Sequence, residues 1–444
     1  MRRRELIGSM VAAGAALLAQ KEARAEQSVA AAARGMRAPR IKDISVISTA
    51  PQGVRLSIVK ITTDQDGLHG YGCATFTQRA DLIEPAVEKY LKPLLLGRPT
   101  DRIEDTWQLC YDSSYWKNGP VLNCAIAGVD MALWDIKGRQ ANMPVYELLG
   151  GKCREAAACY SHASGDEIAQ TIDSARKIMA QGFRHVRVQV GVPGMDGYGA
   201  PRAGGTTRIP SLHDAPVFER EGYIRRVLAM FEACRKELGE EVELIHDAHE
   251  RVNPTEAVQF AKDLEKFRLF YLEDVLSPED IVYFRNIRQQ CTTAIAMGEL
   301  FNNPHEWLPL ATERLIDFIR IHVSEAGGLT PCRKVAAICE AMGVRTAWHG
   351  PADCSPVGHC ANVTLDVACY NFGIQEYSGF NQAAQEVFKG CPVLKDGYLY
   401  ANEAPGWGME VDEAAAAKHP YDRSGALNGG WGELRLPDGT LIKQ

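Results

Sequence analysis

The sequence contains the stretch Val242-Glu243-Leu244-Ile245-His246-Asp247, an apolar run that ends in a carboxylate. Two later stretches repeat this pattern, Leu269-Phe270-Tyr271-Leu272-Glu273 and Ala294-Ile295-Ala296-Met297-Gly298-Glu299. Asp247, Glu273 and Glu299 are equally spaced, 26 residues apart. A spacing of about 26 residues fits one strand, one helix and two loops, the repeat of a parallel βα barrel. Barrel strands all end at one mouth, so we expect these three carboxylates to bind Mg²⁺, which prefers oxygen ligands. The alternative is three unrelated acidic strand ends in surface loops.

Composition narrows the class of protein. The chain has 444 residues, 46% of them hydrophobic and 24% charged, which is enough for two domains with a large core. A formal net charge of −7 provides no basic field for nucleic acid. No apolar run reaches the length of a membrane span, so we expect no membrane anchor in the mature protein. The 13 cysteines show no zinc-ligand spacing and are interpreted as small buried hydrophobic residues.

The N-terminus is typical of an export signal. A basic start, Met1-Arg2-Arg3-Arg4, precedes an apolar, Ala-rich run and the small residues Ala23-Arg24-Ala25. The arginine pair followed by Leu6-Ile7-Gly8 resembles a twin-arginine signal. We therefore expect residues 1–25 to be an export signal, residues 26–40 to be a linker and the protein to be periplasmic, or cytoplasmic if the leader is not used. Removal of the signal takes away five Lys/Arg and two Asp/Glu, so the net charge would change from −7 to −10.

Residues 41–155 predict an α+β capping domain. Two strand-like runs between 41 and 62 and a third at 70–75 come first. Helical patterns follow at 79–96, 101–112 and 119–141. Strands followed by helices indicate an α+β module rather than part of a barrel.

Residues 156–378 alternate between strand and helix patterns. Strands are expected at 157–162, 185–190, 242–247, 268–273, 294–299, 316–321, 344–349 and 372–377. Eight strands with intervening helices predict a (β/α)8-type, modified TIM barrel. The long stretch from 191 to 218 is expected to be a functional loop at the mouth, or else a disordered insertion. Residues 379–444 are expected to pack back on the barrel and the capping domain.

Other polar residues at strand ends are candidates for proton transfer and substrate binding. His249 lies two residues after Asp247, so on an extended strand both would point the same way. Arg187 lies within the second barrel strand and Arg320 within the sixth. His162, His349 and Glu376 end the first, seventh and eighth strands. A single histidine at a strand end is more often structural, but several at one mouth favour a site.

Several sequence motifs resemble those of a known family. Gly128-Val129-Asp130-Met131-Ala132-Leu133-Trp134-Asp135 resembles the junction of capping domain and barrel in the enolase superfamily, mandelate racemase-like branch. Over residues 41–440 the chain resembles the mannonate dehydratase-type family. The matching phrases are Tyr160-Ser161-His162-Ala163, Val192-Pro193-Gly194, Ile245-His246-Asp247-Ala248-His249, Leu272-Glu273-Asp274, Gly298-Glu299-Leu300-Phe301-Asn302, Ala326-Gly327-Gly328-Leu329-Thr330, His349-Gly350 with Asp353, and Asn371-Phe372-Gly373-Ile374-Gln375-Glu376-Tyr377.

This resemblance implies an acid-sugar dehydratase of the mannonate or gluconate type. It implies Mg²⁺ on Asp247, Glu273 and Glu299, and a Tyr198–Arg187 pair that removes the C2 proton. A guanidinium beside a phenol lowers the phenol's pKa, which is consistent with that role. It implies His249 as the acid that expels the C3 hydroxyl as water. The resemblance implies that five residues line the substrate pocket: His162, Arg320, His349, Asp353 and Glu376.

The sequence departs from the family pattern around the substrate. Thr77 stands where the family has Asn, Cys73 where it has Asp, and Pro351 where it has Ala; a C-terminal Trp is also missing. These changes leave the substrate's name open, and they leave open a vestigial sugar-acid-binding or regulatory homologue. An epimerase or racemase on the same fold is less favoured, because the second strand, Val186-Arg187-Val188-Gln189-Val190, has no lysine base. By analogy with the family we expect a homo-oligomer.

Overall fold

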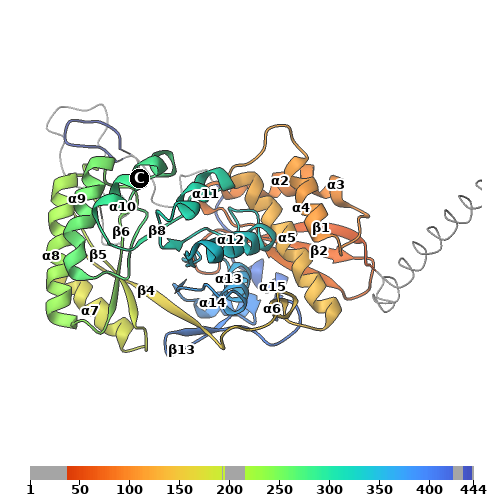
Figure 1. Cartoon of the computed structure of the whole chain (residues 1–444). Coiled ribbons are helices and arrows are strands. Elements are labelled where there is room, and N and C mark those ends of the chain that lie inside the picture. The colour runs from red at the N-terminus through yellow and green to blue at the C-terminus, as the bar shows by residue number, and fades with distance from the viewer. Residues whose placement is uncertain (1–37, 193, 196–215, 424–433, 443–444) are drawn as a thin grey trace, which may run out of the picture. The chain divides into compact units, whose positions relative to one another are not determined.

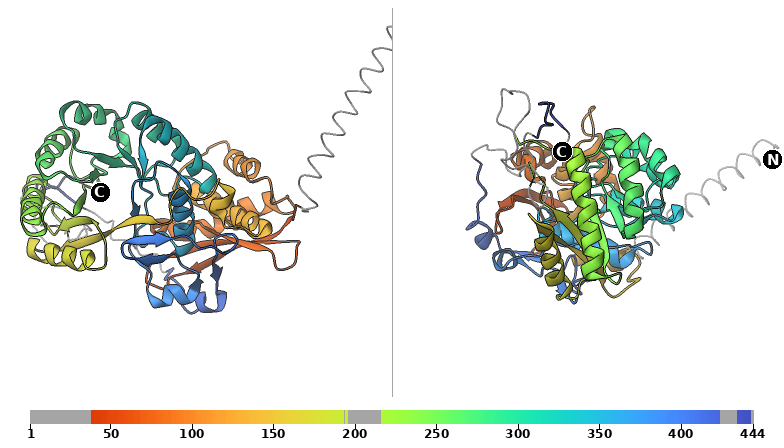
Figure 2. Two further views of the ribbon diagram at one scale, coloured as in Figure 1. Left: turned by 60° about the horizontal axis from the view of Figure 1, so that its bottom comes forward. Right: turned by 90° about the vertical axis from the view of Figure 1, so that its left-hand side faces the viewer.

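The structure, a computed structural model, describes residues 38–192, 194–195, 216–423 and 434–442. The export signal expected at residues 1–25 lies outside the described residues, as does nearly all of the linker, so both stay predictions. Most of the long loop from 191 to 218 also lies outside them. Figures 1 and 2 show the described elements.

A three-stranded antiparallel sheet begins the described chain, in the order β1-β2-β3. The strands are β1 (Ile41–Thr49), β2 (Leu56–Thr63) and β3 (His69–Cys73). The helical elements that follow are η1 (Thr77–Leu82), α2 (Ile83–Ala86), η2 (Val87–Leu91), α3 (Lys92–Leu95), α4 (Ile103–Asp112), α5 (Pro120–Ala141) and α6 (Val145–Leu148). The predicted order of three strands before the helices is therefore confirmed.

Helix α5 packs directly on strand β3 because glycines allow the two backbones to meet. A Cβ atom at Gly72 would lie only 1.9 Å from the carbonyl oxygen of Gly128. Almost every side chain in the middle of α5 is buried, so this helix is buried on all sides rather than on one face. The close contact fixes the end of β3, where Cys73 and the following loop face the barrel.

Eight parallel strands form the barrel. They are β4 (Ala157–Gly165), β5 (His185–Val190), β6 (Glu243–Asp247), β7 (Tyr271–Glu273), β8 (Ile295–Met297), β9 (Phe318–Ile319), β10 (Arg345–Thr346) and β11 (Gln375–Glu376). Strands β4 to β10 pair in sequence order. The ring closes because β11 pairs in parallel with β4 and Phe372 bridges Thr346. This is the predicted (β/α)8-type barrel with an N-terminal α+β capping module.

Helices surround these strands (Figure 1). They are α7 (Ile168–Met179), α8 (Arg220–Leu238), α9 (Pro254–Leu264), η3 (Glu265–Phe267), η4 (Pro278–Tyr283), α10 (Phe284–Gln290), α11 (Pro304–Thr312), α12 (Leu329–Met342) and α13 (Pro356–Ala368). Local sequence defines their starts. Asn253, for example, caps α9 by accepting hydrogen bonds from the Thr255 and Glu256 amides, and Pro254 occupies the first turn.

The C-terminal segment contacts both the barrel and the first sheet. It contains α14 (Gln382–Val387), β12 (Phe388–Lys389), β13 (Val393–Lys395), β14 (Tyr398–Tyr400), β15 (Glu410–Val411) and α15 (Glu413–Ala416). Strand β14 pairs antiparallel with β4 of the barrel. On the other side, Trp407 donates its Nε1 hydrogen to the Tyr71 carbonyl oxygen at 2.9 Å. The chain from Arg40 onward forms one compact unit.

Most of the cysteines are buried, as expected for small hydrophobic residues. All 13 cysteines, which lie within the described residues, are free, and ten of them are buried. Among the helices of the described residues, none is both long and apolar enough to cross a membrane.

Candidate active site

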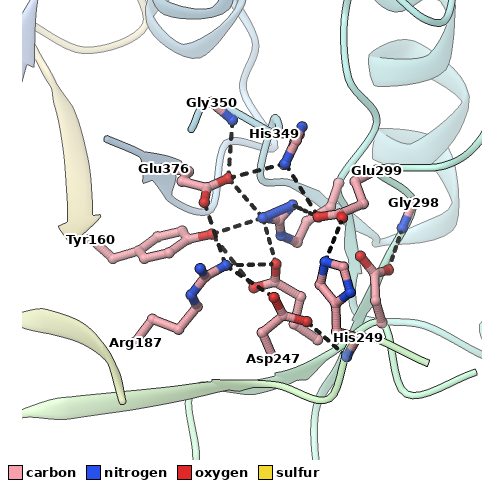
Figure 3. A network of polar contacts seen from close by, with 12 residues as sticks. Tyr160, Arg187, Asp247, His249, Gly298, Glu299, His349, Gly350 and Glu376 are labelled. Carbon is pink, nitrogen blue, oxygen red and sulfur yellow. Dashed lines mark hydrogen bonds and ion pairs between the residues drawn. The ribbon is translucent and has the colours of Figure 1, made fainter. Parts of the chain in front are cut away.

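Charged and polar side chains that lie on the eight barrel strands, or just after them, meet at the carboxyl ends of the strands. Figure 3 shows several of these side chains. Strand register places them at matching heights, since Arg187 of β5 lies opposite His162 of β4. In the same way Glu273 of β7 lies opposite Asp247 of β6. The barrel therefore gathers acids, arginines and histidines that are far apart in sequence.

The carboxylates of Asp247 and Glu273 lie close together at the ends of their strands. With Asp274 they form a group in which one oxygen from each residue lies within 4.8 Å of the others. Glu299 follows β8 by two residues and contacts two histidines instead. Burial raises the pKa of Glu273 well above its usual value, against the opposing effect of Arg320 and with a further increase from Asp247.

Arg320 is the central cation of the site and is fully buried. Its Nη2 atom lies 2.6 Å from Glu273 Oε1 and 2.8 Å from Glu376 Oε2. The same atom donates to the Tyr160 hydroxyl at 2.9 Å. Although burial opposes it, Arg320 together with His162 holds the pKa of Glu376 well below its usual range.

Arg187 is the second buried cation. Its Nη1 atom lies 3.1 Å from Asp247 Oδ2 and 3.5 Å from both Glu273 Oε1 and Glu376 Oε1. His162 joins the same group, with its Nε2 atom 2.7 Å from Glu376 Oε1. Burial, followed by the charge of Arg187, lowers the pKa of His162. The two arginines thus hold the carboxylates together.

His249 lies at the site, but its backbone conformation differs from the extended strand that was expected. Strand β6 ends at Asp247, and His249 has a left-handed backbone with φ of 50°. The extended-strand argument for placing both side chains on one side was therefore wrong. The chain turns, and the His249 amide donates to Asp247 Oδ1 at 2.9 Å while its ring Nε2 lies 3.3 Å from Glu299 Oε1.

His349 lies on the other side of Glu299. Its Nε2 atom is 3.2 Å from Glu299 Oε2 and 3.9 Å from Glu376 Oε2. Burial opposes the effect, but His349 and His249 together hold the pKa of Glu299 well below its usual value. Asp353, in the loop after His349, lies near it, and burial raises the pKa of Asp353.

Most strand bounds differ from the sequence prediction, and three of the differences move candidate site residues relative to their strand ends. His162 lies within β4, which continues to Gly165, so it does not end that strand. Arg320 follows β9 directly, and His349 follows β10 by three residues. The pairing of β9 and β10 is shorter than their apolar runs, because the chain leaves the barrel wall before each run ends.

Tyr198 lies outside the described residues, so its position relative to Arg187 stays a prediction. Sequence reasoning had not assigned roles to Tyr160 and Asp274. Tyr160 is two residues before His162 on β4, and this period-two spacing could have indicated that both face the barrel interior. Asp274 accepts a hydrogen bond from the Gly298 amide at 2.9 Å and links the loops after β7 and β8.

The donors present fit a magnesium ion. Asp247, Glu273 and Glu299 offer only carboxylate oxygens, which hard divalent cations prefer. The raised pKa of Glu273 shows that its buried carboxylate lacks full compensation by the two arginines. A divalent cation beside it would supply that missing charge.

The chain matches two family descriptions that together cover most of its length. Residues 24–150 match the mandelate racemase / muconate lactonizing enzyme N-terminal domain. Residues 170–415 match the enolase C-terminal domain-like family. The chain is thus a member of the enolase superfamily, as the resemblance predicted.

Individual relatives narrow the family further. The chain is 47% identical to the D-galactonate dehydratase family member RspA of Pantoea ananatis, over 90% of this chain and 98% of that protein. It is also 47% identical to family member SEN1436 of Salmonella enteritidis, over 91% and 98%. The chain therefore belongs to the D-galactonate dehydratase family. The family that its sequence motifs resemble was called the mannonate dehydratase-type family above.

Solved structures agree with this assignment. A crystal structure of an enolase from Pantoea ananatis, with bound D-gluconate and Mg, superimposes with a TM-score of 0.86 at 47% identity, covering 91% of this chain and 99% of that one. An enolase superfamily member from Salmonella Typhimurium shares the fold, with a TM-score of 0.76 at 23% identity, over 86% and 98%.

Proposed function

We propose that this protein is a Mg²⁺-dependent dehydratase of acid sugars, which converts an aldonate of the gluconate or mannonate type to a 2-keto-3-deoxy sugar acid. The meeting of four carboxylates, two arginines and three histidines at one barrel mouth supports the proposal most directly. Figure 3 shows several of these groups, among them Arg187, Asp247 and His249. The related Pantoea ananatis structure, with D-gluconate and Mg bound, indicates the same class of ligand.

Asp247, Glu273 and Glu299 are the proposed metal ligands. Mg²⁺ bound there would neutralise the substrate carboxylate and make the proton on the adjacent carbon easier to remove. Arg187 and Arg320 keep these carboxylates converged, and Arg320 also holds Glu376 and Tyr160 in fixed positions. This preorganisation reduces the rearrangement needed when the substrate enters.

Tyr198, with Arg187, is the proposed base that takes the C2 proton. His249 is the proposed acid, which donates a proton to the C3 hydroxyl so that it leaves as water. Its ring Nε2 lies beside Glu299, so its proton would be delivered close to the metal ligands. His162, His349, Asp353, Arg320 and Glu376 are proposed to hold the remaining oxygens of the substrate.

The strand that carries Arg187 argues against a racemase. The polar residues of β5 are His185, Arg187 and Gln189, and none is a lysine of the type that removes protons from the opposite face in racemases. A base on only one face of the substrate is enough to remove the C2 proton in a dehydration, whereas racemisation needs a proton donor or acceptor on both faces.

The purified protein with Mg²⁺ should be assayed against a panel of aldonates and aldarates for 2-keto acid formation. We expect turnover of a gluconate- or mannonate-type acid, with loss of turnover in His249→Asn and loss of C2 proton exchange in D₂O in Tyr198→Phe. Exchange retained in Tyr198→Phe would contradict the assignment of the base. Tight, Mg²⁺-dependent aldonate binding without turnover or exchange would instead support a sugar-acid-binding protein.

A further inference from the structure

Three side chains on one wall of the barrel mouth form a second group of metal-type ligands. His322 follows β9, while His349 and Asp353 lie in the loop between β10 and α13. One donor atom from each residue lies within 4.8 Å of the other two. The His322 and His349 ring centroids are 5.1 Å apart. The group therefore comes from two adjacent loops, while the magnesium ligands come from β6, β7 and β8.

This group contains buried polar atoms without partners. His322 Nδ1, His349 Nδ1 and Asp353 Oδ1 are shielded from solvent and have no hydrogen-bond partner in the described residues. His322 is only 4% exposed. Because an unpaired buried polar atom is costly, three of them in one place indicate a ligand that they bind.

The donor types select the ligand. Two imidazoles and one carboxylate suit borderline transition metals, whereas magnesium prefers oxygen ligands alone.

We propose that His322, His349 and Asp353 bind a divalent transition-metal ion such as Zn²⁺, at a site separate from the carboxylate magnesium site. Bonds of about 2.1 Å in tetrahedral geometry place neighbouring ligands roughly 3.4 Å apart, so these donors need to move by only about 1–1.5 Å. Three protein ligands leave a position for water or a substrate oxygen.

The site has a consequence for the proposed function, although metal binding itself does not depend on it. His349 and Asp353 are proposed to hold substrate oxygens. An ion bound to them would occupy the same wall and compete with the aldonate. The protein would then be inhibited by transition metals at concentrations where Mg²⁺ activates it.

Co²⁺ is a suitable probe, because its visible absorption reports imidazole coordination. The full chain, with Mg²⁺ in saturating excess, is titrated with Co²⁺. We expect one equivalent to bind despite the excess Mg²⁺, and His322→Asn to weaken Co²⁺ binding at least about tenfold. As a matched control, Asp247→Asn should lose Mg²⁺ affinity and keep the Co²⁺ signal.

Two results would overturn the proposal. One is displacement of Co²⁺ by excess Mg²⁺, which would place the ion on the carboxylates. The other is unchanged Co²⁺ binding in His322→Asn. Unchanged Mg²⁺ affinity and thermal unfolding would show that this variant is folded; if it is not, Asp353→Asn must show the same loss of Co²⁺ binding. None of these readouts requires turnover, so they are independent of the dehydratase assay.

Discussion

Replacing Arg320 with methionine tests whether the buried cation holds the site together. The substitution keeps much of the side-chain volume but removes the charge 2.6 Å from Glu273 and 2.8 Å from Glu376. All three side chains are at most 1% exposed. Removing one partner of a buried ion pair leaves an uncompensated charge and costs about 3–5 kcal/mol. We therefore expect the free energy of unfolding to fall by about that amount.

Arg285→Met is a matched control, because it makes the same chemical change at the surface. Arg285 Nη2 lies 2.5 Å from Glu313 Oε1, but the two side chains are 46% and 41% exposed. An exposed pair of this kind contributes little to stability, because solvent screens the two charges. Urea unfolding followed by far-ultraviolet circular dichroism, in EDTA to remove metal ions, measures both variants. Equal losses in the two variants would refute the view that Arg320 neutralises buried carboxylates.

Three further predictions concern other parts of the chain. Burial raises the pKa of Asp130 to about 7, so between pH 4 and 7 the folded state keeps a proton that the unfolded state has lost; stability should fall as pH rises through this window. Asp130→Asn should remove that fall in urea unfolding at pH 5 and 7, and an unchanged pH dependence would contradict it. Gly72→Ala should destabilise the protein by about 1–3 kcal/mol or more, because the new Cβ atom would meet the Gly128 backbone. As a control, Gly222→Ala in helix α8 should stabilise the protein slightly. Thermal unfolding measures both variants, and an unchanged melting temperature of Gly72→Ala would contradict this packing. For the full 444-residue chain of 48.8 kDa, the predicted homo-oligomer should give a light-scattering mass of at least twice that value, and a monomer mass would exclude it.

The fold could be predicted from local sequence patterns, because long-range packing did not change the type of secondary structure that these patterns favour. The equal spacing of Asp247, Glu273 and Glu299 predicted successive βα units, and the first two residues do end β6 and β7. Apolar runs identified all eight barrel strands because buried parallel strands are hydrophobic on both faces. Their ends were less predictable, since hydrogen-bonded pairing stops where the chain turns into a loop, and β9, β10 and β11 pair over only two residues each.

The site was harder to derive from sequence than the fold. Residue type and strand position suggested that His249 and Arg320 belong to it. The left-handed turn at His249 has no local signal, because neither glycine nor asparagine stands there. The central role of Arg320 depends on Glu273 and Glu376, which come from other strands. Such long-range contacts become visible only when the barrel is closed.

The closing pair of the barrel also has a consequence for biosynthesis. Tyr160 of β4 pairs with Glu376 of β11, 216 residues later. On the ribosome the first barrel strand therefore emerges long before its partner, and the catalytic mouth cannot assemble until nearly the whole chain has been translated. During that interval the nascent chain exposes an unpaired apolar edge, which is a state that molecular chaperones bind. A premature stop before Glu376 would thus yield a product without a closed active site, whatever the quality of the sequence before it.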